Sequence, residues 1–290
     1  MSTDQPTDWP AAVSDVVRRR VGTPRGSRRL TGLSGRAVVR VDGSDGSVVV
    51  KIDTHARELQ FYATRAPVLA ALGLGLPVVH YAARPDGPDG PAWLVLEHLP
   101  APLPRERWVG DRAVMSSLAV LHRTVGVLDS IRDPFRPAWT TELTAAAADR
   151  LGPAGDALSD LSDEAQPWLS GTTPISGDPN PRNWGVRADG RPVLFDWERI
   201  GFGHPAVDLA ITVPGLPTMA ETRTAALAYL RASSGDGAPI DAGPTELSRA
   251  LQLIKVWTAV ELLADPRRGS GLDRTCDWLI THLPGWLGGL

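Results

Sequence analysis

The sequence predicts an α+β fold, in which a small antiparallel sheet of five strands with one inserted helix precedes a larger, mainly helical part. Short apolar runs separated by Gly, Pro and Asp turns fill the chain up to residue 96, a pattern typical of strands. After Leu99 and Pro100 the apolar residues recur at helical spacing over long segments. We therefore expect two domains, residues 1–99 and 100–290.

The first domain is expected to begin with a short helix over residues 9–21, where Val13, Val16 and Val17 share one helical face. Antiparallel strands should follow, interrupted by a helix that Thr54 can cap and that ends before Gly73. The predicted strands are residues 30–33, 37–41, 48–51, 76–82 and 93–96, and the inserted helix is residues 54–72.

The second domain should contain one hairpin among its helices, because residues 184–186 and 192–195 flank a turn at Ala188-Asp189-Gly190-Arg191. No other segment of this half has a strand pattern. Helical periodicity predicts helices over residues 112–125, 141–151, 160–169, 219–232, 246–264 and 272–283, with another from about residue 205.

Composition places the chain among ordinary globular proteins, with 42% hydrophobic and 22% charged residues. Cys276 is the single cysteine, so an internal disulfide framework is excluded. No apolar run reaches the ~20 residues that cross a bilayer, and residues 1–10 lack the apolar core of a signal peptide. We expect a cytoplasmic protein with no membrane or nucleic-acid partner, since no basic run interleaved with aromatic residues is present.

Charge is unevenly divided along the chain. Residues 1–140 carry 18 Arg and Lys against 14 Asp and Glu, whereas residues 141–290 carry 12 against 19. A polyphosphate would favour the first part and a cation the second, although random scatter of surface charge explains the division about as well.

Lysine is rare in this sequence. Of its 30 basic residues only Lys51 and Lys255 are lysines. Because arginine cannot replace a compact ammonium that must sit at one point between phosphates and a carboxylate, we expect Lys51 to be functional.

The strongest motif is Ser-Gly-Asp-Pro-Asn-Pro-Arg-Asn at residues 176–183, followed after the hairpin by Phe-Asp-Trp-Glu at residues 195–198. Phosphoryl transfer needs a carboxylate that accepts a hydroxyl proton, and oxygen ligands for magnesium. Asp178, Asn183 and Asp196 supply these groups in the order found in protein kinases. The two prolines stiffen the loop on which Asp178 and Asn183 must converge.

With these residues the sequence resembles the aminoglycoside-phosphotransferase-like family, related to choline kinases and protein kinases, whose pattern is HGDxxxxN, then (I/F)DWE and PxxDLA. This chain has SGDPNPRN and LFDWERIGFGHPAVDLA. The resemblance implies a protein-kinase-like fold of two lobes. It makes Asp178 the catalytic base, Asn183 and Asp196 the Mg²⁺ ligands, and Asp208 a brace of the catalytic loop. Ser176 departs from the pattern, because it replaces the usual histidine and can donate a hydrogen bond only over a shorter reach.

The resemblance also implies a nucleotide site in the first lobe for ATP or GTP. Lys51 would contact the α and β phosphates, and Glu58 would orient it. Backbone amides around Ser34, in the loop of residues 31–36, could cover the phosphates, although a plain hairpin turn explains this loop almost as well. Main-chain groups of Glu97 and Leu99, at the junction of the lobes, would contact the base.

Other chemistries lack their motifs. No GxxxxGK(S/T), GxSxG or HExxH sequence occurs, and the histidines form no metal-ligand cluster with Cys276, so P-loop kinases and common hydrolase or zinc sites are disfavoured. His122, in a Leu-Ala-Val-Leu-His segment, is expected to be a packed core histidine.

The acceptor should lie over the second lobe, as the resemblance implies. Carboxylates there would suit a basic antibiotic, and tryptophans could stack on a sugar or base or cage a quaternary amine. The candidates are Trp197, Glu198, Trp257, Glu261, Asp265, Asp273, Asp277 and Trp278.

Three functions follow from these residues. The first is an O-phosphotransferase acting on an antibiotic or sugar-like small molecule, for resistance or self-protection. The second is a metabolic kinase for choline, homoserine, an amino sugar or a nucleoside. The third is a nucleotide-binding regulator without turnover, suggested by Ser176. The acceptor, the donor base and the oligomeric state stay open.

Overall fold

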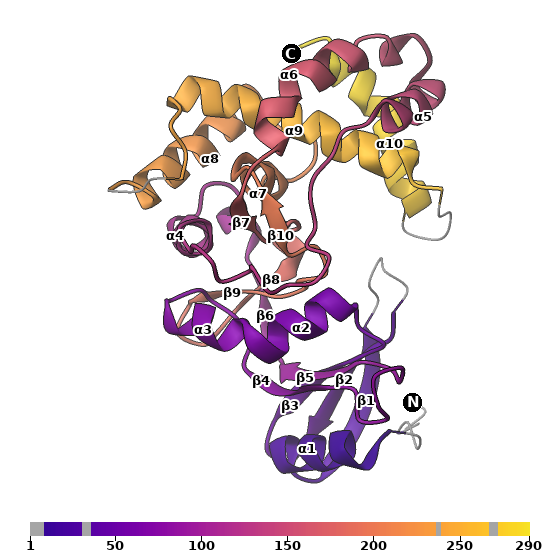
Figure 1. The fold of residues 1–290 in the computed structure, drawn as a ribbon, viewed down its shortest axis with the longest axis vertical. Helices are drawn as coiled ribbons and strands as arrows, with labels where there is room; N and C mark the ends of the chain where they lie inside the picture. Colours follow the sequence, from indigo (N-terminus) through magenta and orange to yellow (C-terminus); the bar gives the residue numbers. More distant parts are fainter. Residues whose placement is uncertain (1–8, 31–35, 236–238, 267–271) are drawn as a thin grey trace.

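The computed structural model describes residues 9–30, 36–235, 239–266 and 272–290. An N-terminal part built on a five-stranded sheet lies below a C-terminal part made mostly of helices (Figure 1). The predicted α+β fold of two lobes is therefore confirmed, while the boundary near residue 100 stays a prediction.

The N-terminal sheet has the strand order β1-β2-β3-β5-β4, and every neighbouring pair is antiparallel. Between β3 and β4 the chain forms two helices. The bounds are β1 (Pro24–Leu30), β2 (Val38–Gly43), β3 (Ser47–Ile52), α2 (Ala56–Thr64), α3 (Ala66–Ala71), β4 (Val79–Ala83) and β5 (Trp93–Glu97).

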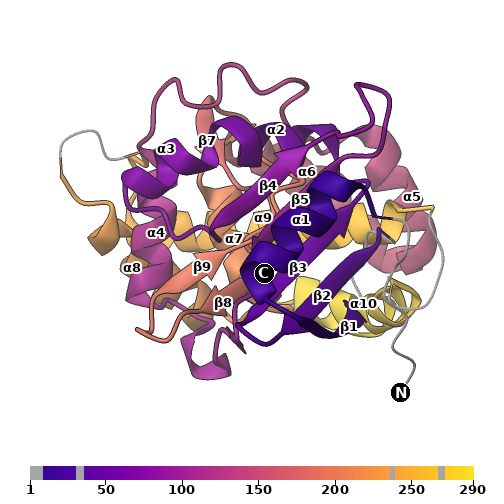
Figure 2. The same ribbon diagram turned by 90° about the horizontal axis from the view of Figure 1, so that it is seen from below.

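Strand alternation decides which face of this sheet carries Lys51. Helix α1 (Ala11–Val21) crosses one face, as Figure 2 shows, and its valines pack there against Val48, Val50 and Val95. Successive side chains of a strand point to opposite faces. Lys51, next to Val50, is therefore directed away from α1, toward α2 and the C-terminal part.

Strand β1 corrects the prediction of a strand over residues 30–33. It occupies residues 24–30 and pairs with β2, whereas residues 31–33 lie outside the described residues. Most of β1 is only half-buried, and it contains Pro24, Gly26 and three arginines. As an edge strand it needs little apolar alternation, which is the signal that sequence patterns report.

The inserted helix is also different from its prediction. It is divided at Arg65 into α2 and α3, and Pro67 lies in the first turn of α3. Proline lacks a backbone N–H, and it is tolerated there because an N–H in the first turn has no intrahelical acceptor. Thr54 does not cap α2, because His55 does so by accepting a hydrogen bond from the Arg57 N–H (3.2 Å).

The C-terminal part packs its helices around α9 (Pro244–Ala264), whose residues are mostly buried. The predicted helices 141–151 and 219–232 are confirmed at both ends, and the others are confirmed with shifted bounds. The remaining bounds are α4 (Arg112–His122), α5 (Thr141–Leu151), α6 (Leu158–Leu169), α7 (Ala206–Thr212), α8 (Met219–Ala232) and α10 (Leu272–Leu287), with 3-10 turns at Arg105–Arg107, Gly152–Gly155 and Pro181–Asn183.

Two short sheets lie near the junction of the two parts. The predicted hairpin is present as β8 (Trp184–Val186) and β9 (Pro192–Leu194), and β6 (Ala101–Pro102) extends it. The expectation of no other sheet is wrong, because β7 (Thr173–Ile175) pairs with β10 (Gly201–Gly203). Strands of three residues are too short to show an alternation of apolar and polar side chains, and these two strands lie apart in the sequence.

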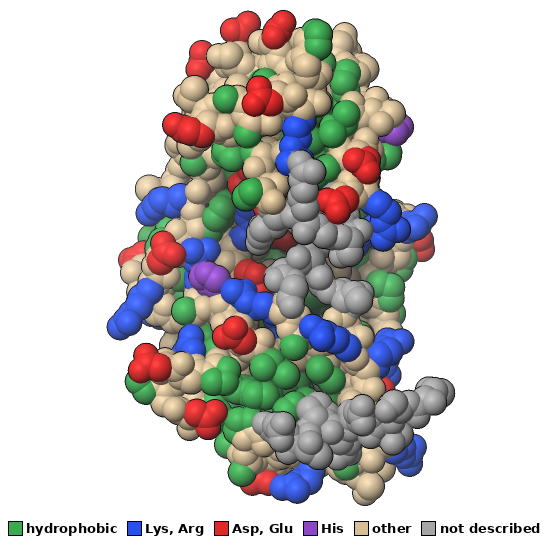
Figure 3. All heavy atoms as spheres, turned by 90° about the vertical axis from the view of Figure 1, so that its right-hand side faces the viewer, with side chains coloured by type: hydrophobic (Ala, Val, Ile, Leu, Met, Phe, Trp, Pro, Cys, Tyr) green, Lys and Arg blue, Asp and Glu red, His purple; other side chains and the backbone are tan. Residues whose placement is uncertain are grey.

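Charge is distributed over the surface much as along the chain. On the face in Figure 3, acidic side chains lie mainly over the upper, helical part, and basic side chains lie mainly across the middle and below. Among the helices that the structure describes, none combines the length and apolar composition needed to span a membrane.

Candidate active site

A buried carboxylate holds the loop that carries Asp178. Asp208, on α7, is fully buried and accepts hydrogen bonds from the backbone N–H groups of Ser176 and Gly177, both at 2.8 Å. Bonds from two consecutive amides to one carboxylate fix the direction in which the loop leaves β7. Asp208 thus braces the loop, as the sequence motif implied.

A histidine and a tyrosine extend this network into the core. His122 Nε2 lies 3.1 Å from Asp208 Oδ2, and Nδ1 lies 2.8 Å from the Tyr229 hydroxyl. In the neutral tautomer with the proton on Nε2, His122 would donate to Asp208 and accept at Nδ1 from the Tyr229 hydroxyl. His122 is buried on α4, so the prediction of a packed core histidine is confirmed.

Ser176 contributes its backbone to this network but not its side chain. Its residue is 2% exposed, and its Oγ has no hydrogen-bond partner among the described residues. The expectation that the serine hydroxyl replaces the histidine as a donor is therefore not met, because the short side chain reaches no described acceptor. Asp208 holds the loop through backbone amides, which any residue except proline supplies at position 176.

Asp178 lies at the centre of the loop, held by two asparagines. Asn180 Nδ2 donates to its Oδ1 (2.9 Å), while Asn183 Nδ2 donates to its main-chain oxygen (2.9 Å) and to Oδ2 (3.1 Å). Burial raises the pKa of Asp178 to about 6, although the Asn180 hydrogen bond and the Arg199 charge oppose this change. A carboxylate with such a pKa is suited to accept a proton near neutral pH.

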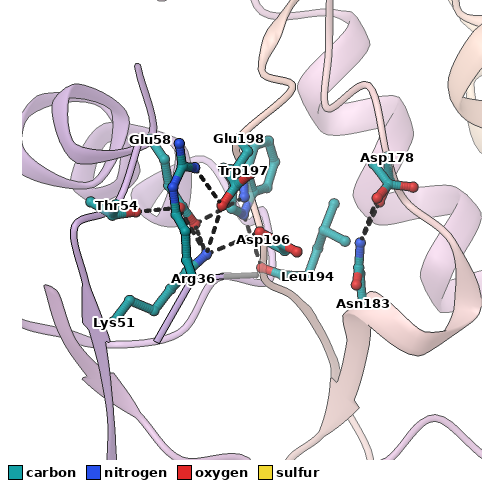
Figure 4. Close-up of polar contacts among 10 residues, drawn as sticks. All are labelled: Arg36, Lys51, Thr54, Glu58, Asp178, Asn183, Leu194, Asp196, Trp197 and Glu198. Carbon is teal, nitrogen blue, oxygen red and sulfur yellow. Dashed lines mark hydrogen bonds and ion pairs between the residues drawn. The ribbon is translucent and has the colours of Figure 1, made fainter. Parts of the chain in front are cut away.

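Asn183 presents its amide oxygen for another partner. Since Nδ2 is committed to Asp178, the neutral Oδ1 is the atom that remains for a cation (Figure 4). Asp196 lies between Asn183 and the Lys51 group in the same view. An amide oxygen and a carboxylate are ligands that Mg²⁺ accepts, so the two residues fit a magnesium site.

Lys51 is clamped between carboxylates of both parts. Its Nζ lies 2.6 and 2.8 Å from the two oxygens of Glu58 and 3.0 Å from Asp196 Oδ1. Burial acts to lower the pKa of Lys51, but the charges of Glu58 and Asp196 outweigh it and raise the pKa. Lys51 is therefore held as an ammonium.

Glu58 is oriented by groups on both sides. It is fully buried, and besides Lys51 it accepts from the Thr54 hydroxyl and from the Trp197 N–H (3.3 Å). Thr54 therefore serves the site rather than the helix end. Since Trp197 follows Asp196, the same contacts tie α2 to the segment after the hairpin.

Asp196 has an unusual backbone conformation. Its φ is +68°, in the left-handed region that non-glycine residues rarely adopt. Aspartate tolerates this region better than most residues, and strained dihedrals are concentrated at functional sites. This turn brings the carboxylate to Lys51.

Sequence reasoning did not place Glu198 and Arg36 beside Lys51. Glu198, expected near the acceptor, lies 4.0 Å from Lys51 Nζ and 3.0 Å from Arg36 Nη1. Carboxylate oxygens of Glu58, Asp196 and Glu198 lie within 4.8 Å of one another, a spacing that could hold a metal ion. Arg36, which carried no sequence signal of its own, lies two residues before β2 and pairs with Glu198 (Figure 4).

Glu97 is the last residue of β5, and Leu99 follows it in the segment that leads to β6. Glu97 pairs with Arg187 of the hairpin at 2.6 Å, and its N–H donates to the Val78 oxygen, so that N–H is already engaged. Leu99 lines a cavity of about 220 Å³ together with Phe195. Ser34 lies outside the described residues.

Most acceptor candidates divide into core residues and surface residues. Trp197 and Trp257 are fully buried, and Trp197 stacks on Phe61 with ring centroids 4.3 Å apart, so neither can contact an acceptor as proposed. Asp273, Asp277 and Trp278 are exposed on α10. Their amphipathic helix shows its polar face to solvent, a pattern that sequence alone does not distinguish from a binding face.

Glu261 is the candidate that lies near the catalytic loop. It is half-buried on α9 and accepts two hydrogen bonds from Arg199 Nη2, at 2.8 and 3.1 Å. Arg199 follows Glu198 and lies over the Phe135 ring at 4.2 Å. Asp265, the residue that follows α9, is also half-buried.

Comparisons with solved structures identify the same fold. A choline kinase from Streptococcus pneumoniae superposes with a TM-score of 0.60 at 14% identity, covering 97% of this chain and 100% of that one. APH(2")-IIia, solved with GDP and kanamycin, gives 0.64 at 14% identity over 97% and 99% of the two chains. Spectinomycin phosphotransferase, solved with ADP and spectinomycin, gives 0.57 at 13% identity over 98% and 95%. No curated protein sequence matches significantly.

A family model gives the assignment at the level of sequence. The model described as phosphotransferase enzyme family matches residues 26–244, which include the sheet, Lys51, the Asp178 loop and α7. The chain therefore belongs to the phosphotransferase enzyme family, as a small-molecule kinase that transfers a phosphoryl group to an alcohol.

Proposed function

We propose that this enzyme transfers the γ-phosphoryl group of a magnesium nucleoside triphosphate to a hydroxyl of an antibiotic or sugar-like molecule. The observation that carries this proposal is that Asp178, Asn183, Asp196 and Lys51 come from both parts of the fold to one region, where Lys51 pairs with Asp196 and Asn183 with Asp178 (Figure 4). Asp178 supplies a proton acceptor, Asn183 and Asp196 supply oxygen ligands, and Lys51 supplies a fixed ammonium.

In this mechanism Asp178 accepts the proton of the attacking hydroxyl. The hydroxyl oxygen bonds to the γ-phosphorus, and the bond from that phosphorus to the bridging oxygen breaks, so the diphosphate leaves with the electron pair. Lys51, held by Glu58, would bind the α and β phosphates. Mg²⁺, bound by Asn183 and Asp196, would neutralise phosphate charge. No phosphoenzyme is required, and positioning supplies much of the acceleration.

The donor base stays open between adenine and guanine. Spectinomycin phosphotransferase was solved with ADP and APH(2")-IIia with GDP, and both share this fold. We propose ATP as the donor. We also propose a cytoplasmic location, where the donor would be drawn from the cell's nucleotides.

The antibiotic acceptor is proposed from the kanamycin and spectinomycin named for two structural neighbours. A metabolic acceptor such as choline is the alternative, because a choline kinase has the same fold. Trp197 and Trp257 are buried, so they could not cage the quaternary amine of choline.

A substitution at Asp178 tests the reaction. We expect Asp178→Asn to lower turnover by about 100-fold or more, because general-base catalysis contributes on this scale, while nucleotide affinity stays near that of wild type. Turnover is measured as the mass gain of one phosphate over a panel of aminoglycosides, nucleoside and peptide antibiotics, choline and amino sugars.

The matched control is Asp189→Asn, which removes a carboxylate at the exposed hairpin turn. Unchanged turnover in Asp178→Asn would exclude Asp178 as the base. Nucleotide binding with no phosphorylated product from any acceptor would favour the regulator instead.

A further inference from the structure

Arg57, which directly precedes Glu58 on α2, directs its side chain to the C-terminal part of the fold. The side chain is 11% exposed, and all three of its guanidinium nitrogens donate hydrogen bonds. Nε donates to the main-chain oxygen of Asp133, Nη1 to the main-chain oxygen of Glu198 (3.0 Å), and Nη2 to the Asp133 carboxylate (3.1 Å). A planar guanidinium with three fixed acceptors is held in one orientation.

Arg57 and Glu58 together hold the backbone that follows Asp196. Glu58 accepts a hydrogen bond from the Trp197 N–H (3.3 Å). Arg57 donates one to the Glu198 oxygen (3.0 Å). Two adjacent residues of α2 thus bind an N–H and a C=O of this segment, and Figure 4 shows Glu58 beside Trp197 and Glu198. Asp196 itself has φ +68°, a strained conformation that persists only where its surroundings hold it.

The acceptors of Arg57 belong to two segments that are themselves joined. Asp133 lies in the strap, which we define as residues 130–135 between α4 and α5. Phe135, two residues further on, exchanges backbone hydrogen bonds of 2.9 and 3.1 Å with β10 and the residue before it. Since β10 is the next strand after Asp196, the strap is fixed to the same stretch of chain. Arg57 therefore binds a frame that belongs to the C-terminal part.

α2 is docked on the strap by further contacts that do not involve Arg57. Gln60 Nε2 donates to the Ser130 oxygen (2.6 Å), and its Oε1 accepts from the Arg132 N–H (2.8 Å). Arg65, the C-cap of α2, donates to the Ser130 hydroxyl. The docking of α2 on the strap is thus shared among several side chains. What distinguishes Arg57 is its additional bond to the segment after β9.

We propose that Arg57 is a positioning residue for the phosphoryl transfer, which holds the backbone after Asp196 so that the Asp196 carboxylate stays directed at the Mg²⁺ of the nucleotide. The inference rests on the proposed function. Arg57 acts through Asp196 and needs no contact with nucleotide, metal or acceptor. One turn of α2 then serves both halves of the site, because Glu58 orients Lys51 and its neighbour orients the metal ligand. Substitution of residues that orient a metal ligand typically costs about 10- to 100-fold in metal affinity or activity.

The test measures how nucleotide binding depends on Mg²⁺, so it needs no knowledge of the acceptor. Arg57→Met keeps the apolar stem and removes the guanidinium. Affinities for the imidotriphosphate analogues of ATP and GTP, which resist hydrolysis, are measured by calorimetry over a series of Mg²⁺ concentrations and in EDTA. In Arg57→Met the Mg²⁺ concentration that gives half of the gain in affinity should rise about tenfold or more, whereas the affinity in EDTA should equal that of wild type.

Three variants separate positioning from general support of the fold. Arg57→Lys keeps a cation without the planar fork, and its Mg²⁺ dependence should lie between those of wild type and Arg57→Met. Arg65→Met removes the other arginine that joins α2 to the strap, and it should keep the wild-type Mg²⁺ dependence. Asp133→Asn removes the charge of a side chain that is 89% exposed, and it should have little effect because the main-chain acceptors of Arg57 remain.

The outcomes separate this inference from the proposed function. If wild type binds neither analogue with Mg²⁺, or binds them no better than in EDTA, the proposed function fails. If wild type shows the gain but Arg57→Met has the same Mg²⁺ dependence, or loses affinity equally with Mg²⁺ and in EDTA, the positioning role is excluded while nucleotide binding stands. An equal shift in Arg65→Met would also exclude it. If Arg57→Met does not fold, Arg57→Lys decides, and a wild-type Mg²⁺ dependence in that variant would contradict the role.

Discussion

At the scale of single residues, Asp196 combines a left-handed backbone conformation with a carboxylate that pairs with Lys51. Its positive φ allows aspartate or asparagine at low cost, and its carboxylate meets Lys51 at 3.0 Å. The pairing with Lys51 in this structure occupies an oxygen that a metal ion would also attract. Asp196 therefore has the properties of a ligand rather than of a structural acid.

Substitution of Asp196 should weaken metal-dependent nucleotide binding. We expect Asp196→Asn, which keeps the left-handed conformation and removes the charge, to lower the Mg²⁺-dependent affinity about tenfold or more, because the cation loses its anionic ligand. Calorimetry with Mg²⁺ and with EDTA measures the difference. Asp196→Ala should lose stability as well, since alanine is strained at φ +68°. Equal affinities for wild type and Asp196→Asn with Mg²⁺ would contradict the assignment.

The pKa of Asp178 predicts the acidic limb of the pH profile. Because the base must be deprotonated and burial raises its pKa to about 6, kcat/KM should fall about tenfold per pH unit below pH 6 and level off above it. Initial rates between pH 4.5 and about 8 measure this limb once an acceptor is known. A profile flat to about pH 4.5, near the usual pKa of an aspartate, would show that another group limits the rate.

At the scale of elements, the loop of residues 176–183 depends on a glycine. Gly177 has φ +76°, and a Cβ there would lie 2.3 Å from the Arg199 oxygen and 3.0 Å from the Phe135 ring. Position 177 therefore excludes side chains for two separate reasons. The tight approach lets Asp208 reach two consecutive amides.

Substitution of Gly177 should destabilise the fold for two reasons, the positive φ and the clash with the Arg199 oxygen. Gly177→Ala should lower the free energy of unfolding by more than about 1 kcal/mol, the scale of a positive φ in alanine. Gly190→Ala is the control, because Gly190 has φ +83° and no atom within 4 Å of its Cβ position. Denaturant unfolding of both variants separates the cost of the clash with Arg199 from the cost of the positive φ. Equal losses of unfolding free energy in the two variants would show that the loop can shift away from Arg199.

At the scale of the whole molecule, the site exists only where the two parts meet. Lys51 and Glu58 come from the sheet and α2, whereas Asp178, Asn183 and Asp196 come from segments more than a hundred residues later. Arg36 with Glu198, and Glu97 with Arg187, add ion pairs across the same junction. A ligand that binds between the parts should stabilise both.

A magnesium nucleotide should therefore raise the melting temperature of the chain. At a ligand concentration of about 100 times Kd, linkage adds about 2.7 kcal/mol to the stability. Thermal unfolding with ATP and GTP, each with Mg²⁺ or EDTA, measures the effect and the preferred base. EDTA should remove most of the rise in melting temperature that the nucleotide causes in wild type. The magnesium nucleotide should raise the melting temperature of Asp196→Asn only slightly. An increase that is independent of Mg²⁺ would exclude the proposed metal site.

Sequence alone determined the reaction and the main elements of the fold. Asp178, Asn183 and Asp196 could be proposed as site residues because they follow one another in a fixed order around a short loop and hairpin, and Lys51 because lysine is rare in this chain. Long helices such as residues 141–151 and 219–232 were readable because their apolar faces repeat within one segment. These are properties that neighbouring residues specify together.

Only the tertiary structure decided which side chains meet. Glu198 lies 4.0 Å from Lys51, Trp197 and Trp257 lie in the core, and β7 pairs with β10. Burial and long-range contacts depend on how helices and strands pack, and no local pattern encodes that packing.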